Sequence, residues 1–194
     1  MTTKIAVFAS GSGSNFQAIQ EAILRGELDA TIELVVTDKP DAFVVKRAEK
    51  FEIPVFSFTA KDYKSKADYE LEIIKVLQEK EVEWVVLAGY MRLIGETLLA
   101  AFPYHIVNIH PSLLPSFPGK DAIGQAMDHG VKITGVTVHF VDEGMDTGPI
   151  LAQAAVEVVE GNRAATEERI HAIEHVLYTE TLKQLFENKV NIYH

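Results

Sequence analysis

Short apolar runs alternate with helical segments along the first half of the chain, and this alternation constrains the fold more than any other feature. The apolar runs span residues 4–10, 31–37, 54–58 and 83–88, and the segments with helical periodicity span residues 15–25, 42–51 and 62–80. Runs that are apolar throughout are typical of strands buried on both faces. Strands that alternate with helices in this way predict a parallel sheet covered by helices.

The second half of the chain continues the pattern with a break after residue 110. We expect helices at residues 96–102, 122–129 and 164–187, and strands at residues 105–109, 132–141 and 150–159. Pro111, Pro115 and Pro118 exclude a helix from the loop that contains them. The sequence therefore predicts an α/β fold, a single-domain Rossmann-like open twisted sheet over residues 1–194, mostly parallel with an antiparallel portion near the C-terminus and with helices on both faces.

Composition and charge restrict the classes of function. The 194 residues are 47% hydrophobic and 24% charged, as in ordinary globular domains. A formal net charge of −10 with only 18 lysines and arginines argues against nucleic acid as a partner. The lack of cysteine excludes disulfides and thiolate metal sites, and no apolar run has the length of a membrane span. We therefore expect a cytoplasmic protein that binds neither nucleic acid nor membrane. The last predicted helix could pack inward or pair with a second subunit, so a monomer and a homodimer both stay open.

Loops after the strands are the candidate ligand sites, because open α/β sheets bind ligands beyond the carboxyl ends of their strands. The loop at residues 10–15 is rich in glycine and serine and precedes a helix, whose N-terminal N–H groups can hold an anion. Its pattern begins like a dinucleotide fingerprint, but Phe16 replaces the third glycine, so a single phosphate suits it better than a pyrophosphate. A glycine turn with Ser14 or Asn15 as the helix cap is the structural alternative.

The loop at residues 89–95 follows the most apolar strand and could form the wall of a slot for an aromatic heterocycle, although its Met and Leu could equally be core residues.

Asn108 and His110 stand two positions apart at the end of a strand, so their side chains lie on the same face. An amide and an imidazole on one face can together stabilise one developing oxyanion. The loop at residues 142–149 joins the last two strands; its residues are common turn formers, and its position beside the other loops makes it a candidate.

Each of these loops carries a recognisable motif. GSGSN follows the first strand, AGYMRLI begins at Ala88, NIHPSLLP begins at Asn108 and DEGMDTGP begins at Asp142. Together these motifs resemble the phosphoribosylglycinamide formyltransferases of purine synthesis, and the likeness covers nearly the whole chain. The NIHPSLLP block and the aspartate downstream of it are shared by several folate formyltransferases, whereas the glycine-serine loop narrows the acceptor to a ribonucleotide.

The resemblance implies a reaction and a set of functional residues. The reaction is formyl transfer from 10-formyltetrahydrofolate to the amine of glycinamide ribonucleotide, with no metal. The implied catalytic residues are Asn108, His110 and Asp146, and the implied ribonucleotide site contains Gly13, Ser14, Asn15 and Glu174, with His171 nearby. The implied folate slot contains Lys66, Met91, Arg92, Leu93, Ile94, Asn108, Asp142, Glu143, Gly144, Met145 and Asp146.

Two details of this resemblance bear on the organisation of the chain. Residues 1–100 would form a phosphate-binding half of the formyltransferase domain, and residues 101–194 a catalytic and folate-binding half. Lys66 stands where the family often has an arginine that reaches the folate, and a lysine supplies charge but no planar bidentate fork.

Other functions remain open from the sequence alone. His171, Glu174 and His175 match an inverted zinc-protease pattern, although little chain follows that could supply a third ligand. Asp38 follows the second strand, where an NAD-binding module has a ribose-binding acid, although Phe16 weighs against this function. Among related formyltransferases, a tRNA-modifying enzyme would carry an added C-terminal domain and a formylfolate hydrolase an added N-terminal domain, and we expect neither.

Overall fold

A computed structural model describes residues 1–187 of the chain. Its strands are hydrogen-bonded in the order β3-β2-β1-β4-β5-β6-β7. The pairs β1–β2, β1–β4 and β2–β3 are parallel, and β6–β7 is antiparallel. This arrangement confirms the predicted fold, an open and mostly parallel α/β sheet with an antiparallel C-terminal portion. By its internal contacts the chain divides into an N-terminal unit, residues 1–107, and a C-terminal unit, residues 108–194.

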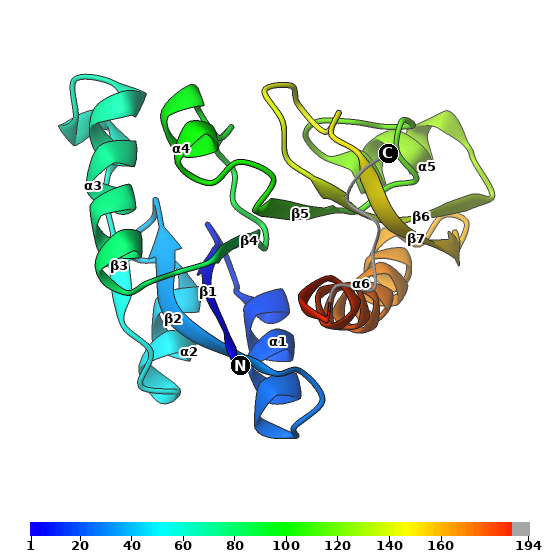
Figure 1. Ribbon diagram of the computed structural model, residues 1–194. Coiled ribbons are helices and arrows are strands. Elements are labelled where there is room, and N and C mark those ends of the chain that lie inside the picture. Colours follow the sequence, from blue (N-terminus) through cyan, green and yellow to red (C-terminus); the bar gives the residue numbers. More distant parts are fainter. Residues whose placement is uncertain (188–194) are drawn as a thin grey trace. The chain divides into compact units, whose positions relative to one another are not determined.

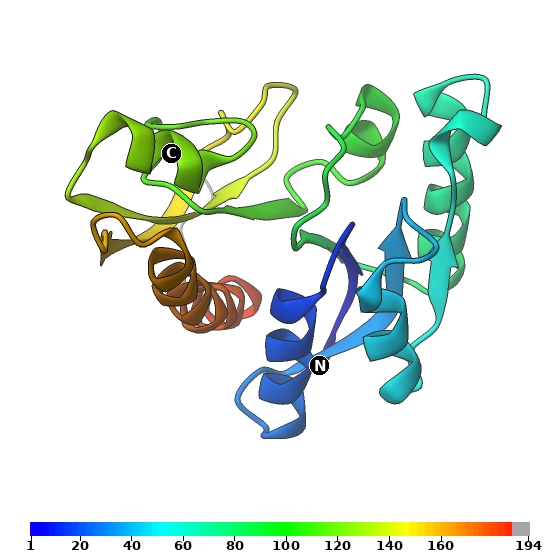
Figure 2. The same cartoon turned by 180° about the vertical axis from the view of Figure 1, so that it is seen from behind.

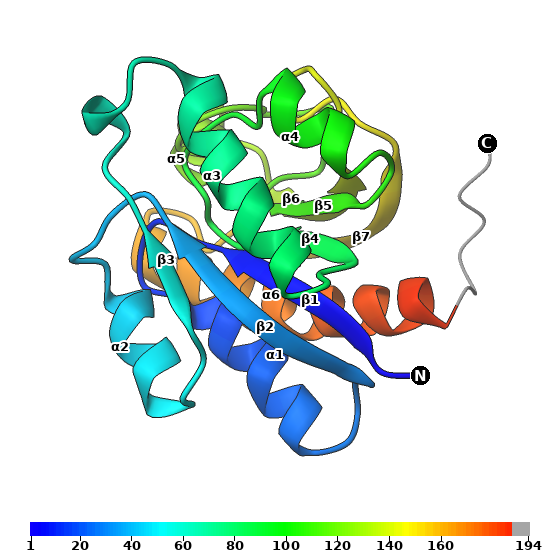
Figure 3. The same ribbon diagram turned by 60° about the vertical axis from the view of Figure 1, so that its left-hand side comes forward.

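The N-terminal unit contains the parallel strands and four helices. In chain order its elements are β1 (Thr3–Phe8), α1 (Ser14–Leu24), β2 (Ala30–Thr37), α2 (Phe43–Lys50), β3 (Val55–Ser57), a 3-10 turn (Ala60–Asp62), α3 (Lys66–Glu79), β4 (Trp84–Leu87), α4 (Glu96–Ala101) and the start of β5 (Ile106–His110). Helices α1 and α2 cover one face of the strands and α3 covers the other (Figures 1 and 3). Because both faces are covered, β1 from Ile5 to Phe8 is fully buried, as its continuous apolar sequence predicts.

The winding of the N-terminal unit reverses between β1 and β4. From β1 the chain proceeds to β2 and β3 on one side, and β4 then pairs with the other side of β1. This is a topological switch point, where the loops that follow two neighbouring parallel strands separate and leave room for a ligand. The loops concerned are those at residues 9–13, after β1, and at residues 88–95, after β4.

The C-terminal unit contains the end of β5 and the antiparallel pair. Its other elements are α5 (Ala122–His129), β6 (Ile133–Phe140), β7 (Ile150–Glu157) and α6 (Arg163–Phe186). Helix α6 packs along β6 and β7 (Figure 2). Both helices begin at capping side chains, since Asp121 accepts a hydrogen bond from the Gly124 N–H at 3.3 Å and Asn162 accepts one from the Ala165 N–H at 3.0 Å.

One predicted helix boundary is wrong. The sequence predicts a helix from residue 62, but α3 begins at Lys66, and Ala60–Asp62 form a separate 3-10 turn. Ser65 is the reason, because its hydroxyl accepts a hydrogen bond from the Asp68 N–H at 3.2 Å and so caps the helix. Among the described residues, 1–187, none of the helices combines the length and the hydropathy that crossing a bilayer requires.

Candidate functional site

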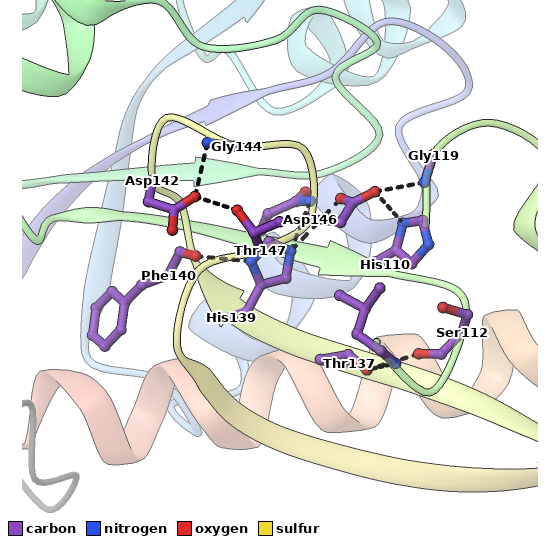
Figure 4. A network of polar contacts seen from close by, with 12 residues as sticks. His110, Ser112, Gly119, Thr137, His139, Phe140, Asp142, Gly144, Asp146 and Thr147 are labelled. Carbon is purple, nitrogen blue, oxygen red and sulfur yellow. Dashed lines mark hydrogen bonds and ion pairs between the residues drawn. The ribbon is translucent and has the colours of Figure 1, made fainter. Parts of the chain in front are cut away.

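The end of β5 and the loop after β6 bring three of the predicted site residues together in the C-terminal unit. Asn108 and His110 lie two residues apart on β5, and Asp146 belongs to the loop that joins β6 to β7. Figure 4 shows the side chains of His110 and Asp146 facing each other. Nδ1 of His110 lies 3.6 Å from Oδ2 of Asp146, and the two side chains are only 8% and 11% exposed. A distance of 3.6 Å is an ion-pair contact but is too long for a hydrogen bond. The predicted catalytic residues are therefore neighbours, and their roles stay a prediction.

His110 is oriented by the loop that follows it. Its Nε2 lies 2.9 Å from the backbone carbonyl oxygen of Phe117. A carbonyl only accepts hydrogen bonds, so Nε2 must carry a proton, and Nδ1 is the ring nitrogen that faces Asp146. If Nδ1 is also protonated, the Nε2–H group of the imidazolium donates to the Phe117 carbonyl and the Nδ1–H group faces the negative charge of Asp146. The loop thereby leaves Nδ1 as the nitrogen that can reach a reacting group.

The same loop fixes Asp146. The Gly119 N–H donates a hydrogen bond to Oδ2 of Asp146 at 2.8 Å. Gly119 has a φ of 82° and Asp146 a φ of 56°, both in the left-handed region that Gly adopts freely and that Asp and Asn tolerate better than most residues. The predicted proline loop is thus a scaffold that holds the imidazole through one carbonyl and the carboxylate through one N–H.

Further hydrogen bonds hold this scaffold to β6. The hydroxyl of Thr137 donates to the carbonyl oxygen of Ser112 at 2.7 Å and accepts from the Leu114 N–H at 3.1 Å. The hydroxyl of Ser112 donates to the carbonyl oxygen of Ser116 at 2.6 Å. These bonds tie the loop after β5 to the buried side chain of Thr137 on β6. The loop therefore has little freedom to move away from His110.

His139 is a residue of this site that the sequence did not reveal. It lies on β6 and is 2% exposed, its Nδ1 is 2.8 Å from the carbonyl oxygen of Phe140, and its Nε2 is 3.3 Å from Nδ2 of Asn108. Nδ1 must donate to the carbonyl, and burial lowers the pKa of His139 and favours the neutral ring. Nε2 therefore accepts a hydrogen bond from the Asn108 amide, which fixes the orientation of that amide. The available signal was that Thr137 and His139 stand two positions apart, on one face of the strand, in its otherwise apolar second half.

This assignment of His139 predicts a graded effect of substitution. Phe at position 139 cannot accept the Asn108 hydrogen bond, so His139→Phe is expected to lower kcat about tenfold, the equivalent of one net hydrogen bond. Gln offers a side-chain oxygen that can accept the bond, so His139→Gln is expected to lose less. Steady-state kinetics of the two variants, with thermal melting as a check on folding, measure the difference; equal losses would show that the acceptor is unimportant.

The predicted folate residues of the loop at residues 142–149 form a hydrogen-bonded turn. Oδ1 of Asp142 accepts hydrogen bonds from the Gly144 N–H at 2.9 Å and from the Thr147 hydroxyl at 2.7 Å. Met145 is 55% exposed, and Glu143 is exposed as well. Asp142 therefore shapes the turn that carries Asp146, while Met145 and Glu143 present side chains to the exterior of the loop.

The predicted phosphate loop lies in the N-terminal unit at the start of α1. Gly13 occupies the N-cap position with a φ of 76°, so neither Ser14 nor Asn15 is the N-cap residue, and that alternative is wrong. A Cβ atom on Gly13 would lie 2.6 Å from Cγ2 of Val44, so a larger residue does not fit there. The first turn of α1 has backbone N–H groups that can donate hydrogen bonds to an anion.

The predicted folate residues that follow β4 divide into exposed and anchored side chains. Met91 is 70% exposed and Leu93 is 44% exposed, whereas Ile94 is 3% exposed and belongs to the core. Nζ of Lys66 donates a hydrogen bond to the carbonyl oxygen of Leu93 at 2.7 Å, and Nε of Arg92 donates one to Asp38 at 2.9 Å. Both cationic side chains therefore hold the loop itself, and Met91 and Leu93 are the side chains most open to a ligand.

Glu174 and His171 lie one turn apart on α6. Nδ1 of His171 is 3.3 Å from Oε2 of Glu174, and this contact raises the pKa of His171. Glu174 is 5% exposed, whereas the side chain of His171 is 51% exposed. His171 also borders a shallow, open depression along α6, with Ala164, Glu167, Glu168, Ala172 and His175.

The two other functions considered from the sequence find no support here. Across residues 1–187 no group of three or more His, Cys, Asp or Glu side chains is arranged to hold a metal ion, so the zinc-protease pattern at His171, Glu174 and His175 lacks a third ligand. Asp38, the candidate ribose-binding acid, is 4% exposed, and its two oxygens already accept hydrogen bonds from Ser10 and Arg92.

Comparisons with known proteins place this geometry in context. Residues 3–182 match the family model described as formyl transferase. The chain is 57% identical over 183 residues to a phosphoribosylglycinamide formyltransferase of Bacillus subtilis (strain 168), and the match covers 94% of each sequence. A crystal structure of glycinamide ribonucleotide transformylase 1 from Geobacillus kaustophilus has 57% identity and a TM-score of 0.93, over 95% of this chain and 99% of that one. A crystal structure of phosphoribosylglycinamide formyltransferase from Bacillus halodurans has 52% identity and a TM-score of 0.93, over 98% of this chain and 99% of that one.

Proposed function

The chain belongs to the formyl transferase family, and from that premise we propose that it transfers a formyl group from 10-formyltetrahydrofolate to the amine of glycinamide ribonucleotide. The products are formylglycinamide ribonucleotide and tetrahydrofolate, in a step of de novo purine synthesis that takes place in the cytoplasm. The observation that carries the proposal is a cluster of an amide, an imidazole and a carboxylate. Asp146 lies 3.6 Å from His110 and 3.9 Å from His139 (Figure 4), and His139 is hydrogen-bonded to Asn108.

The chemistry of the reaction defines what these side chains must do. An amine of this kind has a pKa of about 8, so a useful fraction is already unprotonated near neutral pH. Attack on the formyl carbon forms the new C–N bond and places negative charge on the formyl oxygen. The bond from that carbon to the folate nitrogen then breaks, and a proton must move from the attacking nitrogen to the departing one. The enzyme must therefore stabilise an oxyanion and transfer a proton.

Asn108 and His110 are suited to the first task. The Asn108 amide gives one N–H to His139, at a nitrogen distance of 3.3 Å, and so keeps its second N–H for the oxyanion. His110 donates its Nε2–H to the Phe117 carbonyl oxygen. A proton on Nδ1 would be donated to the oxyanion, which also accepts from Asn108. Each donor is held from behind by another hydrogen bond, and such preorganised donors stabilise developing charge most effectively.

Asp146 is suited to the second task. Its carboxylate lies 3.6 Å from Nδ1 of His110, on the side of the ring that faces the reacting group. At 3.6 Å a polar contact can also be bridged by water, and we propose that Asp146 moves the proton between the two nitrogens through such a water. Neither a covalent intermediate nor a metal ion takes part in this mechanism.

We assign the substrates to the residues that the resemblance indicates. The phosphate of the ribonucleotide binds to Gly13, Ser14 and Asn15, whose backbone leads into the first turn of α1. Glu174, with His171, binds the acceptor. The folate contacts the loop after β4 through Met91 and Leu93, whereas Ile94 belongs to the core, and it contacts Asp142 to Asp146. Lys66 contributes through its hydrogen bond to Leu93, which supports the loop.

One assay tests the proposed reaction directly. The protein is mixed with 10-formyltetrahydrofolate and glycinamide ribonucleotide, and loss of the formyl group from the folate is followed by absorbance. Deformylation that requires the ribonucleotide, with formylglycinamide ribonucleotide as the product, is the expected result. Deformylation at the same rate without an acceptor would indicate a hydrolase, and no deformylation under either condition would refute formyl transfer.

The role of Asn15 is tested by a change in substrate affinity. A hydrogen bond to a charged group contributes roughly 1.5 to 3 kcal/mol, so Asn15→Ala is expected to raise KM for the ribonucleotide at least about tenfold. KM for the folate and kcat should change little, because Asn15 does not contact the reacting atoms. Gln20→Ala, further along the same helix, is the matched control. A fall in kcat at constant KM would contradict the assignment of Asn15 to substrate binding.

A further inference from the structure

Asp38 is a buried carboxylate for which the proposed mechanism has no use. It follows β2 and is 4% exposed, so it cannot itself be in contact with a substrate in this structure. A carboxylate withdrawn from water requires hydrogen-bond donors, and Asp38 takes them from two loops that are distant in sequence. Its Oδ1 accepts from the Ser10 hydroxyl at 2.5 Å, and its Oδ2 accepts from Nε of Arg92 at 2.9 Å.

We propose that Asp38 is a positioning residue that couples the phosphate loop to the folate loop, so that occupation of one by its substrate raises the affinity of the other. The two loops follow β1 and β4, the neighbouring strands of the switch point, and both lie in the N-terminal unit. The inference rests on the proposed function, since it takes the ligands of the two loops to be a ribonucleotide and a folate.

Ser10 is the link on the side of the phosphate loop. Its hydroxyl donates to Asp38 and accepts a hydrogen bond from the Met91 N–H at 2.9 Å, while its own N–H donates to the Gly89 carbonyl at 2.9 Å. The hydroxyl is therefore used once as a donor and once as an acceptor within the protein. Ser10 stands three residues before Gly13, so movement of the phosphate loop is transmitted through this hydroxyl to Asp38 and to the backbone at Met91.

Arg92 is the link on the side of the folate loop. Its guanidinium is bound to Asp38, and its side chain is 33% exposed against 2% for that of Asp38. Met91 and Leu93, the exposed residues that flank Arg92, are the side chains we assign to folate contact. A ligand that orders these residues also restrains Arg92, and through Asp38 it restrains Ser10.

The sign of the coupling follows from conformational entropy. A ligand that binds one loop must bear the cost of ordering it, and the shared hydrogen bonds order part of the other loop at the same time. The second ligand then meets a loop that is already restrained, and its affinity rises. Coupling between two sites typically amounts to a factor of about 5 or more in the dissociation constant, and it is equal in both directions.

The test measures binding without turnover. The Kd of glycinamide ribonucleotide is determined by titration calorimetry with and without saturating tetrahydrofolate, for the wild-type chain and for the Ser10→Ala and Asp38→Asn variants. In the wild type, tetrahydrofolate should lower the Kd about fivefold or more, and in both variants the factor should fall below about 2. A merely structural role of Asp38 would lower the melting temperature and leave that factor unchanged.

Asp29→Asn is the matched control. Asp29 also accepts a hydrogen bond from a hydroxyl distant in sequence, that of Thr2 at 2.9 Å, but it is exposed and lies before β2. This variant should keep the wild-type factor.

If Asp38→Asn does not fold, Ser10→Ala carries the test, because it removes only one hydroxyl. Wild-type protein that binds both ligands and transfers the formyl group, yet shows no coupling or a coupling that survives in Ser10→Ala, overturns this inference and leaves the proposed function standing. Wild-type protein that binds neither ligand overturns both.

Discussion

Replacement of Asp146 by Asn is expected to lower kcat about a thousandfold and to change KM for either substrate by less than about threefold. The carboxylate is the group we assign to proton transfer, and it lies 3.6 Å from Nδ1 of His110. An amide cannot transfer the proton, because it does not take one up near neutral pH. The effect should therefore fall on the chemical step.

The fold should survive this substitution. Asn matches Asp in shape, its oxygen can still accept the hydrogen bond from the Gly119 N–H, and Asn tolerates the left-handed backbone of residue 146, where φ is 56°. Asp128→Asn, at an exposed position of α5, makes the same chemical change away from the cluster and should leave kcat unaltered. Steady-state kinetics with both substrates varied, together with thermal melting, give the answer. A large rise in KM with kcat preserved would assign Asp146 to binding instead of proton transfer.

Most element boundaries could be predicted because local signals in the sequence agree with the fold. The helix expected at residues 122–129 is found as Ala122–His129, because Asp121 caps its start and Gly130, with a φ of 83°, ends it. The start of α3 was missed because Asp62 and Ser65 are both good N-cap residues, and only the 3-10 turn at residues 60–62 decides between them. When two neighbouring residues are equally good N-cap residues, the sequence does not say which of them begins the helix, and the surrounding packing decides.

The candidate site could be predicted where strand geometry determines it. Asn108 and His110 are two residues apart on β5, and the period of a strand places them on one side. The approach of Asp146 depends on the turn at residues 142–147 and was inferred through the resemblance. The backbone atoms that hold the site, the Phe117 carbonyl and the Gly119 N–H, have no signature in a sequence because every residue carries them.

Long side chains were the least predictable part of the site. The resemblance implies that Lys66 and Arg92 are cations close to the folate, and the structure shows that each bonds within the protein, to the Leu93 carbonyl and to Asp38. A flexible side chain can reach several acceptors, and the choice among them depends on which acceptors are buried within its reach and need donors. Asp38 is such an acceptor, and its donors, Ser10 and Arg92, come from loops more than 25 residues away on either side.

The Asn108→Ala variant should show the second large loss of activity, about 100- to 1000-fold in kcat, the usual effect of removing one oxyanion donor. The substitution removes the N–H that we assign to the formyl oxygen, and it also leaves Nε2 of His139 without the amide that lies 3.3 Å from it. Binding of the ribonucleotide phosphate should be preserved, because Asn108 is not among the residues assigned to it.

Two comparisons separate the chemical effect of Asn108→Ala from a loss of stability. Asn162→Ala removes the cap of α6, where the Asn162 oxygen accepts from the Ala165 N–H at 3.0 Å, and should lower the melting temperature while kcat stays at the wild-type value. The double variant Asn108→Ala/Asp146→Asn should lose far less than the product of the two single losses, since an amide that stabilises an oxyanion and a carboxylate that moves the proton serve the same tetrahedral intermediate. If the two losses multiply in full, Asn108 and Asp146 act in separate steps, and the single cluster drawn around His110 is not the unit of catalysis.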